Sequence, residues 1–482
     1  MFVLILIKII SILAAIIGFF FLIPLGVALY YHESSVYFAF LIPMAISFVI
    51  AIIINLLTRK KKIVLTIRQT YVMVALAWIF SSLMSSLPLF FSGCFYSYVD
   101  AFFESVSGFS TTGVTILSAV ENLPRSINLW RCITHWLGGM GIVTLTVALL
   151  PLLGVGGFQL IKAETTGPEK NKVTARITTT AKVLWGLYIG FTVIQTIALK
   201  IAGMDFVDAM SHAFSTLGTG GFSTRNDSIG SYNSVAIEVI CTIFMFIAGI
   251  NFSLFFFMIT GKFKEVLKNS EFKTYISFIV IFILGITFSL LKTYGSFGTS
   301  LRKASFQVIS LMTTTGYSTA DYLQWPYVSQ FFLFLLFFIG GCSGSTSGGI
   351  KVIRWTILGK VFKNETKKMI HPHGVFSLRI DGKPVTNELI NNVVSFFFLY
   401  AVLVVVTTFA GCIAHLDLWT AFTSALSMIG NVGPAFGKCG PTANMGFLPS
   451  YLKLIYCFAM IAGRLELYTI LIFFTSSFWK NK

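Results

Sequence analysis

The chain has 482 residues, of which 56% are hydrophobic, 16% are aromatic and only 11% are charged, and its formal net charge is +17. A soluble protein carries about a quarter charged residues, so this composition excludes a soluble globular protein and indicates an integral membrane protein. Runs of apolar residues long enough to cross a ~30 Å hydrocarbon core as helices recur along the chain.

The N-terminal part contains two plain apolar spans, at about 2–30 and 36–57, followed by the basic run 59–62. The first span is too long for a signal-peptide core and has no small-x-small cleavage site, so we expect a retained membrane helix. The seven cysteines lie far apart and form no CxxC pair. This argues against a disulfide framework and against a zinc site.

From residue 69 onward one pattern occurs four times: a long apolar span, a short half-polar segment ending in a glycine-containing cassette, and a second apolar span. The outer spans are expected at 69–92, 180–203, 272–292 and 389–413, and the second spans at 127–152, 234–260, 328–358 and 450–478. The key glycines are spaced by 108, 95 and 117 residues. Such repetition predicts duplicated units packed around a shared axis.

The short segments before the cassettes have small and aromatic residues at helical spacing. They cover 100–109, 208–217, 303–312 and 418–428. A helix of ten residues is about 15 Å long, which is half a bilayer, so each segment is predicted to be a re-entrant half-helix. Non-helical backbone at that depth must be buried or must line a watery cavity. We therefore expect an all-α polytopic fold in which two extra N-terminal helices accompany four helix–pore-loop–helix repeats around one pore. The expected units are 1–68, 69–158, 159–262, 263–362 and 363–482.

The four cassettes are candidate ligands for a cation. Small residues are also common at contacts between membrane helices, which is the alternative explanation for any single cassette. Four copies in the same context favour a filter in which backbone carbonyls and threonine hydroxyls replace the hydration shell of an ion. Glycine permits the backbone angles that turn successive carbonyls inward. The candidate filter residues are Thr111, Thr112, Gly113, Val114, Thr219, Gly220, Gly221, Phe222, Thr314, Thr315, Gly316, Tyr317, Asn431, Val432, Gly433 and Pro434.

The distribution of basic residues predicts the orientation. With the N-terminus inside, the expected cytoplasmic segments hold 24 Lys and Arg residues and the outer segments hold nine. This bias places both termini in the cytoplasm and opens the cassettes to the outside. The net charge of +17 therefore needs no nucleic acid as a partner.

These cassettes, together with the motifs 135–141 and 463–466, resemble the TrkH family, the membrane subunits of bacterial Trk potassium uptake. That family belongs to a superfamily with KtrB and the plant HKT proteins, and the likeness covers the whole chain. It implies K⁺ as the transported ion, an inner-membrane location, a homodimer and a TrkA-type cytoplasmic partner that supplies nucleotide control. In the superfamily a serine in place of the first filter glycine accompanies Na⁺ transport, whereas this chain has Gly113. The fourth cassette departs from the others because Asn431 and Val432 replace a Thr-Thr pair.

A glycine- and serine-rich segment, 340–349, interrupts the second span of the third repeat. Half of its residues are glycine, so it cannot form a stable membrane helix. It does not match a phosphate-binding loop, because no Ser or Thr follows a Gly-Lys pair and no strand precedes it. A helix kink is the simple alternative, and the family likeness implies a flexible gate beneath the filter. The candidate gating residues are Gly340, Gly341, Ser343, Gly344, Ser345, Gly348, Gly349 and Arg464.

Arg464 is expected in the middle of an apolar span, where a charge costs about 2.5–3.5 kcal/mol on insertion scales. It either pairs with an acid or faces the pore and repels cations. Glu466 is two positions along and on another helix face, which makes it a poor direct partner. His135 has no metal-ligating residue at suitable spacing, so we expect it to pack between helices.

The outer acidic residues Asp100, Glu104, Asp205, Asp208, Asp227 and Asp321 have two possible roles. They could concentrate cations near the mouth, or they could cap the pore helices. No arrangement of a nucleophile and a base is present, so an enzyme is not expected. A proton- or sodium-coupled carrier (a symporter) of a small solute is the alternative function, since carriers also use broken helices.

Overall fold

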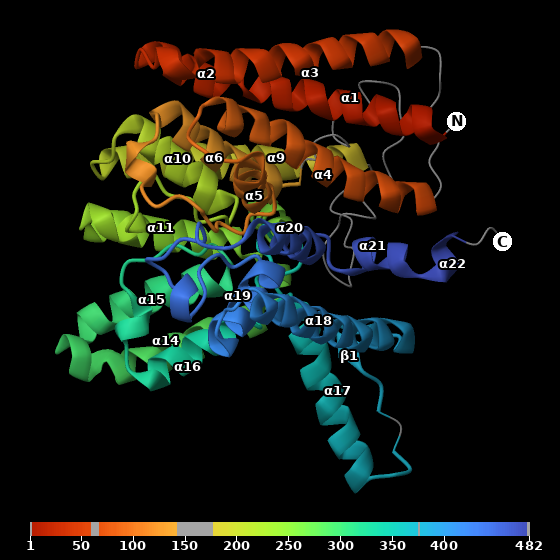
Figure 1. Cartoon of the computed structure of the whole chain (residues 1–482). Coiled ribbons are helices and arrows are strands. Elements are labelled where there is room, and N and C mark those ends of the chain that lie inside the picture. Colours follow the sequence, from red (N-terminus) through yellow and green to blue (C-terminus); the bar gives the residue numbers. More distant parts are fainter. Residues whose placement is uncertain (1, 59–66, 142–176, 375, 480–482) are drawn as a thin grey trace.

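The structure is a computed structural model that describes residues 2–58, 67–141, 177–374 and 376–479. The basic run 59–62, the last part of the expected span 127–152 and most of the segment 159–182 lie outside these residues. Two antiparallel N-terminal spans form one face of the molecule (Figure 1). They comprise α1 (Phe2–Phe20), α2 (Leu22–Tyr30) and α3 (Tyr37–Thr58). α1 packs on α3 and on the first helix of the first repeat.

The four repeats follow in the expected order. Repeat 1 contains α4 (Ile67–Phe91), α5 (Tyr98–Phe109) and α6 (Arg125–Gly139), and repeat 2 contains α9 (Ile177–Ile201), α10 (Phe206–Leu217), α11 (Val235–Ala248), α12 (Phe252–Ile259) and α13 (Phe263–Lys268). Repeat 3 contains α14 (Ser270–Tyr294), α15 (Phe297–Met312), α16 (Tyr327–Leu336) and α17 (Val352–Ile370), and repeat 4 contains α18 (Asn387–Ile413), α19 (Leu418–Gly430), α20 (Ser450–Arg464), α21 (Tyr468–Leu471) and α22 (Ser476–Trp479). A short 3₁₀ turn follows each of the four cassettes, at Val120–Asn122, Ser228–Tyr232, Tyr322–Gln324 and Gly437–Cys439.

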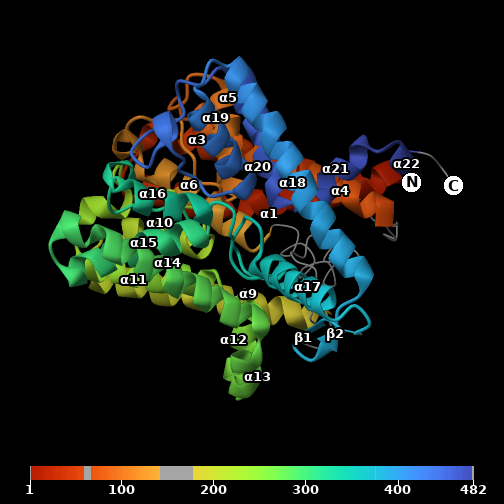
Figure 2. The ribbon, with the colours of Figure 1, turned by 90° about the horizontal axis from the view of Figure 1, so that it is seen from below.

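The predicted outer spans and half-helices agree with the structure to within a few residues, apart from the third half-helix, which starts earlier, at Phe297. Within the residues that the structure describes, six helices are long and apolar enough to cross a membrane, and two bent pairs could each be a further span. The repeats pack in sequence around an axis: α10 packs on α6, α11 on α15, α17 on α18, and α20 returns to α5. The short helices α5, α10, α15 and α19 cluster toward one end of the molecule, and α1 begins and α22 ends at the other (Figures 1 and 2).

A short hairpin joins repeats 3 and 4. Its strands, β1 (Arg379–Ile380) and β2 (Lys383–Pro384), pair antiparallel, with Arg379 opposite Pro384. Ile380 packs against α17 and α18, and Lys360 donates to the Arg379 carbonyl. In Figure 1 the C-terminal half of α17 projects from the rest of the molecule.

Two of the second spans are broken where the sequence predicted continuous helices. The span 234–260 bends by 94° between α11 and α12, and the span 450–478 bends by 114° after Arg464. At the first break the amides and carbonyls of the chain bond to the 340–349 segment instead of continuing the helix. At the second break Glu466 and Leu467 take positive φ angles of 56° and 60°, which end α20. Arg464 therefore lies at a helix end, not at mid-span as predicted.

Close helix packing near the axis depends on glycine, which gives a testable prediction. A Cβ on Gly138 of α6 would lie under 3.0 Å from the backbone of Phe109 at the end of α5, whereas a Cβ on Gly186 of α9 meets nothing. We expect Gly138→Ala to destabilise the fold by about 1–3 kcal/mol because neither backbone can yield cheaply. Gly186→Ala is the matched control and should change stability by less than about 1 kcal/mol. Thermal unfolding of the detergent-solubilised protein measures both, and equal midpoints would contradict the expectation.

Candidate functional site

Each pore helix ends in the same way. The amides of Thr112, Gly220, Thr315 and Val432 each bond to the carbonyl of a serine five residues earlier, at 2.8–3.0 Å. A bond of this type closes a helix C-terminus when the preceding residue takes the left-handed conformation. Those preceding residues are Thr111, Thr219, Thr314 and Asn431, with φ of 56°, 53°, 56° and 52°. The four cassettes are therefore four copies of one backbone structure.

Three of these left-handed positions hold threonine, a β-branched residue for which positive φ is a true outlier. Backbone strain of this kind persists only where the surroundings enforce it, and it gathers at functional sites. The fourth copy holds Asn431, a residue that tolerates the conformation well. Its side-chain amide donates to Thr112 Oγ1 at 3.0 Å and to the Met460 carbonyl at 2.9 Å. Asparagine in place of threonine in the fourth cassette is thus explained, because its side-chain amide links this cassette to the first cassette and to α20.

The four key glycines close a ring. Each has a positive φ, between 79° and 103°. A Cβ on any of them would lie under 3.0 Å from a carbonyl oxygen of the next cassette. The glycine–carbonyl pairs are Gly113 with Gly220, Gly221 with Thr315, Gly316 with Val432, and Gly433 with Thr112. Because the last pair returns to the first cassette, the four loops surround one axis at the same level.

The carbonyl oxygens in this ring accept no hydrogen bond from the part of the chain that the structure describes. Within the described chain no hydrogen bond reaches the carbonyls of Thr112, Gly220, Thr315 or Val432. Buried backbone carbonyls in proteins are otherwise almost always paired, so this set can bind a cation or water. One cavity of about 110 Å³ opens on the ring, and all four key glycines line it. Pore-helix serines hold the chain just beyond, because Ser107, Ser310 and Ser427 donate to carbonyls at Val114, Tyr317 and Gly433.

The threonine hydroxyls are largely used within the protein. Thr112 and Thr315 bond to Ser110 and Thr313, and Thr219 donates to the carbonyl of Gly218. Thr314 Oγ1 accepts from Gly348 in the 340–349 segment, and Thr111 Oγ1 is buried without a partner among the described residues.

At least one side chain crosses each contact between neighbouring cassettes. Arg131 bonds to Ser223 between repeats 1 and 2, and Tyr317 bonds to Phe222 between repeats 2 and 3. Tyr322 bonds to Ala435 between repeats 3 and 4, and Asn431 bonds to Thr112 between repeats 4 and 1. His135 is buried beside the contact between repeats 1 and 2, where it bonds to Ser215 and stacks on Phe222 with ring centroids 4.1 Å apart. His135 therefore packs between repeats, as predicted, and no group of His, Cys, Asp or Glu in the described chain could hold a metal.

The outer acids are mostly paired or act as caps. Glu104 and Asp100 form ion pairs with Arg131 and Lys453, and Asp208 lies 3.6 Å from Arg225. Asp205 and Asp321 accept from backbone amides at helix starts. No Asp or Glu lines the cavity, whose charged lining residues are Arg131 and Arg225. The capping alternative is the one these contacts support, and the acids do not form an open cation-collecting rim.

Ion pairs join two of the short helices, α5 and α15, to the second apolar span of the preceding repeat. Arg302 on α15 lies 3.3 Å from Glu238 on α11, and two further pairs occupy matching positions. Asp100 on α5 pairs with Lys453 on α20 at 2.7 Å, and Lys303 on α15 pairs with Glu238 on α11 at 2.8 Å. Asp100 and Lys303 both lie thirteen residues before their key glycine, and Lys453 and Glu238 are both the fourth residue of their helix. Asp100 and Lys303 therefore occupy equivalent positions with opposite charges, and so do Lys453 and Glu238.

The 340–349 segment lies against the third and fourth cassettes, at the C-terminal ends of α15 and α19. Gly348 donates to Thr314 Oγ1 at 2.6 Å, and a Cβ on Gly348 would lie under 3.0 Å from Gly430 and Asn431. The segment also fills the break between α11 and α12, where Cys342 donates to the carbonyl of Gly249 and Phe252 donates to that of Gly344. Glu271 of α14 accepts from Ser343 at 2.6 Å. These contacts explain why the α11–α12 span is broken.

Arg464 joins three elements at this level. One guanidinium nitrogen donates to the Thr346 carbonyl at 2.7 Å, and another donates to the carbonyls of Gly138 and Gly139 at 2.8 and 2.9 Å. The last two carbonyls are the negative end of the α6 helix. Glu466 pairs instead with Arg354 at the start of α17, an ion pair that the sequence did not predict.

A family profile described as a cation transport protein, TrkH, matches residues 37–481. The chain belongs to the TrkH family. It is 39% identical to the Trk system potassium uptake protein TrkH of Escherichia coli over 428 residues, which is 88% of each protein. It is 36% identical to TrkG of the same organism, covering 95% of each chain. The crystal structure of the potassium transporter TrkH from Vibrio parahaemolyticus matches with a TM-score of 0.87 and 33% identity, covering 100% of both chains.

The ion pair between Asp100 and Lys453 gives a prediction about stability. Lys453 and Asp100 are mostly buried, so Lys453→Met leaves a carboxylate without its partner and should destabilise the fold by about 3 kcal/mol. Lys368→Met is the control, because its pair with Glu365 is half exposed and should contribute less than about 1 kcal/mol. A double-mutant cycle with Asp100→Asn, read by thermal unfolding, separates the pair energy from packing. A coupling energy near zero would show that this ion pair does not hold repeats 4 and 1 together.

Proposed function

We propose that this protein takes up K⁺ across a bacterial inner membrane through the ring of four cassettes. The observation that carries the proposal is the closed ring of carbonyl oxygens that have no donor among the described residues. A cation that sheds its water needs such oxygens, and the C-terminal ends of four pore helices add a negative potential at the same place. The E. coli and V. parahaemolyticus relatives are potassium uptake proteins by name, which supports K⁺ as the ion.

The 340–349 segment and Arg464 act as the gate in this proposal. The segment blocks the inner side of the filter, and Arg464 fixes it to the end of α6. A guanidinium at this depth also repels a cation that leaves the filter. Opening requires the bonds from Gly348 to Thr314 and from Arg464 to Thr346 to break, while the backbone of the glycine-rich segment can adopt other conformations.

A nucleotide-binding cytoplasmic protein of the TrkA type regulates the channel in this proposal, and the subunit works as a homodimer. The projecting half of α17 is a suitable docking element, since it carries exposed lysines together with the exposed side chains of Phe362, Met369 and Ile370. The excess of basic residues in the inner segments and the common end at which α1 begins and α22 ends both support cytoplasmic termini.

The alternative is a carrier that couples a small solute, or K⁺ itself, to H⁺ or Na⁺. Recordings from the purified protein in a planar bilayer separate the two mechanisms. The pore proposal requires unitary K⁺ currents that follow the electrochemical gradient. Saturating flux without unitary currents, or uphill K⁺ movement driven by a proton gradient, would favour the carrier.

The proposal predicts how the ring discriminates between ions. Gly113→Ala places a methyl group against the carbonyl of Gly220, which displaces a ligand, so the ratio of K⁺ to Na⁺ uptake should fall at least about tenfold. Gly93→Ala is the control, because Gly93 has a similar φ of 72° and open space around it. Uptake into proteoliposomes measures both ratios. If Gly113→Ala kept the wild-type ratio, the ring would not be the filter.

A second prediction concerns the gate. Arg464→Ala removes the three hydrogen bonds that hold the segment to α6, so K⁺ flux without a regulatory partner should rise by about fivefold or more. Shortening the 340–349 segment by two glycines should act in the same direction. Arg125→Ala, at the exposed outer end of α6, should leave the flux unchanged. Unchanged flux and ion preference in Arg464→Ala would end the gate hypothesis.

A further inference from the structure

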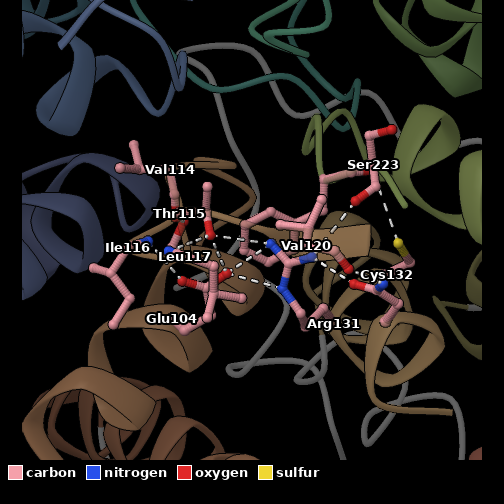
Figure 3. Close-up of polar contacts among 12 residues, drawn as sticks. Glu104, Val114, Thr115, Ile116, Leu117, Val120, Arg131, Cys132 and Ser223 are labelled. Atoms are coloured by element: carbon pink, nitrogen blue, oxygen red, sulfur yellow. Dashed lines mark hydrogen bonds and ion pairs between the residues drawn. The ribbon is translucent and has the colours of Figure 1, made fainter. Parts of the chain in front are cut away.

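The four cassettes are not supported by the same side chains, and the first two are held by a buried ion pair. Arg131 of α6 and Glu104 of α5 form an ion pair in which the side chains are 1% and 0% exposed. Figure 3 shows the guanidinium between Glu104 on one side and Ser223 on the other. This pair lies immediately behind the first two cassettes, outside the ring of carbonyls itself.

Arg131 reaches both cassettes. Its Nε and one terminal nitrogen donate to Glu104 Oε1 at 2.9 and 2.7 Å, and that terminal nitrogen also donates to Thr115 Oγ1 at 3.2 Å. Its other terminal nitrogen donates to Asn128 at 2.9 Å and to the carbonyl of Ser223 at 3.5 Å. The guanidinium also lies over the ring of Phe222, 4.2 Å from the centroid.

Glu104 holds the first cassette from the other side. Its Oε1 accepts from Thr115 Oγ1 at 2.8 Å, and its Oε2 accepts from the Ile116 amide at 3.1 Å. Every oxygen and nitrogen of the pair therefore has a partner, and most partners belong to the two or three residues that follow a key glycine. A fully satisfied network of buried polar groups is rigid, because any displacement leaves a charge unpaired in a low dielectric.

The equivalent positions in the other repeats show the asymmetry. Glu104 lies nine residues before Gly113, and the residues at that offset in repeats 2, 3 and 4 are His212, Gln307 and Ser424. His212 bonds to Ser223, two residues after its glycine, as Glu104 bonds to Thr115. Ser424 bonds to Tyr456 of α20, and both amide atoms of Gln307 are buried without a partner among the described residues. Repeats 1 and 2 are thus braced behind the filter, and repeats 3 and 4 are not braced in this way.

We propose that Glu104 and Arg131 are positioning residues that set the discrimination between K⁺ and Na⁺ by fixing the first two cassettes. The proposal rests on the proposed function of the ring as a filter. A ring whose carbonyls are held in place cannot contract around the smaller Na⁺, so a rigid half preserves the preference for the larger ion. The ion pair is electrically neutral as a whole, which allows a positive residue to line the outer cavity without repelling the incoming cation.

Arg131→Lys is the decisive variant because it keeps the charge and removes the fork that reaches two cassettes. We expect the ratio of K⁺ to Na⁺ uptake in proteoliposomes to fall about tenfold, while the maximal rate of Na⁺ uptake stays the same or rises. Arg125→Lys is the matched control on the same helix, since its ion pair with Asp205 is exposed. A merely structural role would lower both maximal rates together and leave the ratio alone.

Glu104→Gln separates charge from geometry. It leaves the Arg131 charge uncompensated at the cavity, so the KM for both cations should rise in addition to the fall in ratio, and Asp205→Asn is its control. The double variant Glu104→Gln/Arg131→Gln should restore the KM, because the net charge is again zero, but should not restore the ratio. Thr115→Val, which removes one link and keeps the pair, should lower the ratio about threefold and tests the proposal if the charged variants do not fold.

The outcomes are distinct. If the wild-type protein does not prefer K⁺ to Na⁺, the proposed function fails. If the wild type prefers K⁺ and Arg131→Lys and Thr115→Val do so equally, the filter proposal stands and this inference is wrong. An equal loss of ratio in Arg125→Lys would also overturn it, because the effect would not then belong to the buried pair.

Discussion

The structure depends on one constraint: four peptide carbonyls, one in each cassette, accept no hydrogen bond from the described residues, and the fold has to hold them in place. The ring of glycines meets this constraint. Each glycine admits the carbonyl of the next cassette at a distance that no side chain allows, and three threonines accept positive φ angles so that the chain can turn there. The serines of the short helices and the side chains that cross between neighbouring cassettes hold this strained backbone in one arrangement.

Elsewhere buried backbone groups need partners, and this requirement explains the break between α11 and α12. The 340–349 segment has few side chains to bury, so its own amides and carbonyls must find partners in the protein. They find them in the backbone of the α11–α12 break, in Glu271 and in Thr314. A continuous helix through 249–251 would have no backbone groups to offer. The break in repeat 2 and the segment in repeat 3 are therefore two halves of one structure.

The sequence predicted the outer spans, the half-helices and the four cassettes because each leaves a local signal, either a long apolar run or glycines at matching spacing. It did not predict the breaks at 249–251 and after Arg464, since each span taken as a whole is apolar enough to be a membrane helix. Gly249 and Asn251 within an apolar span were the available signal for the first break. The ion pairs were beyond reach, because Asp100 and Lys453 are 353 residues apart and only the closed ring brings them together. The same holds for Glu466 and Arg354.

The ion pairs Asp100–Lys453 and Lys303–Glu238 carry opposite charges at equivalent positions, which bears on how four similar repeats find their correct neighbours. Each pore helix could in principle dock against the second helix of a wrong neighbour, since the repeats share one backbone plan. If α5 docked on α11, Asp100 would meet Glu238, and if α15 docked on α20, Lys303 would meet Lys453. Like charges brought together in a poorly hydrated contact are unfavourable, whereas the native neighbours attract. The ion pairs therefore favour the native neighbours of α5 and α15 over these exchanged contacts, which disfavours two of the misassembled arrangements that a chain built from internal copies would otherwise permit.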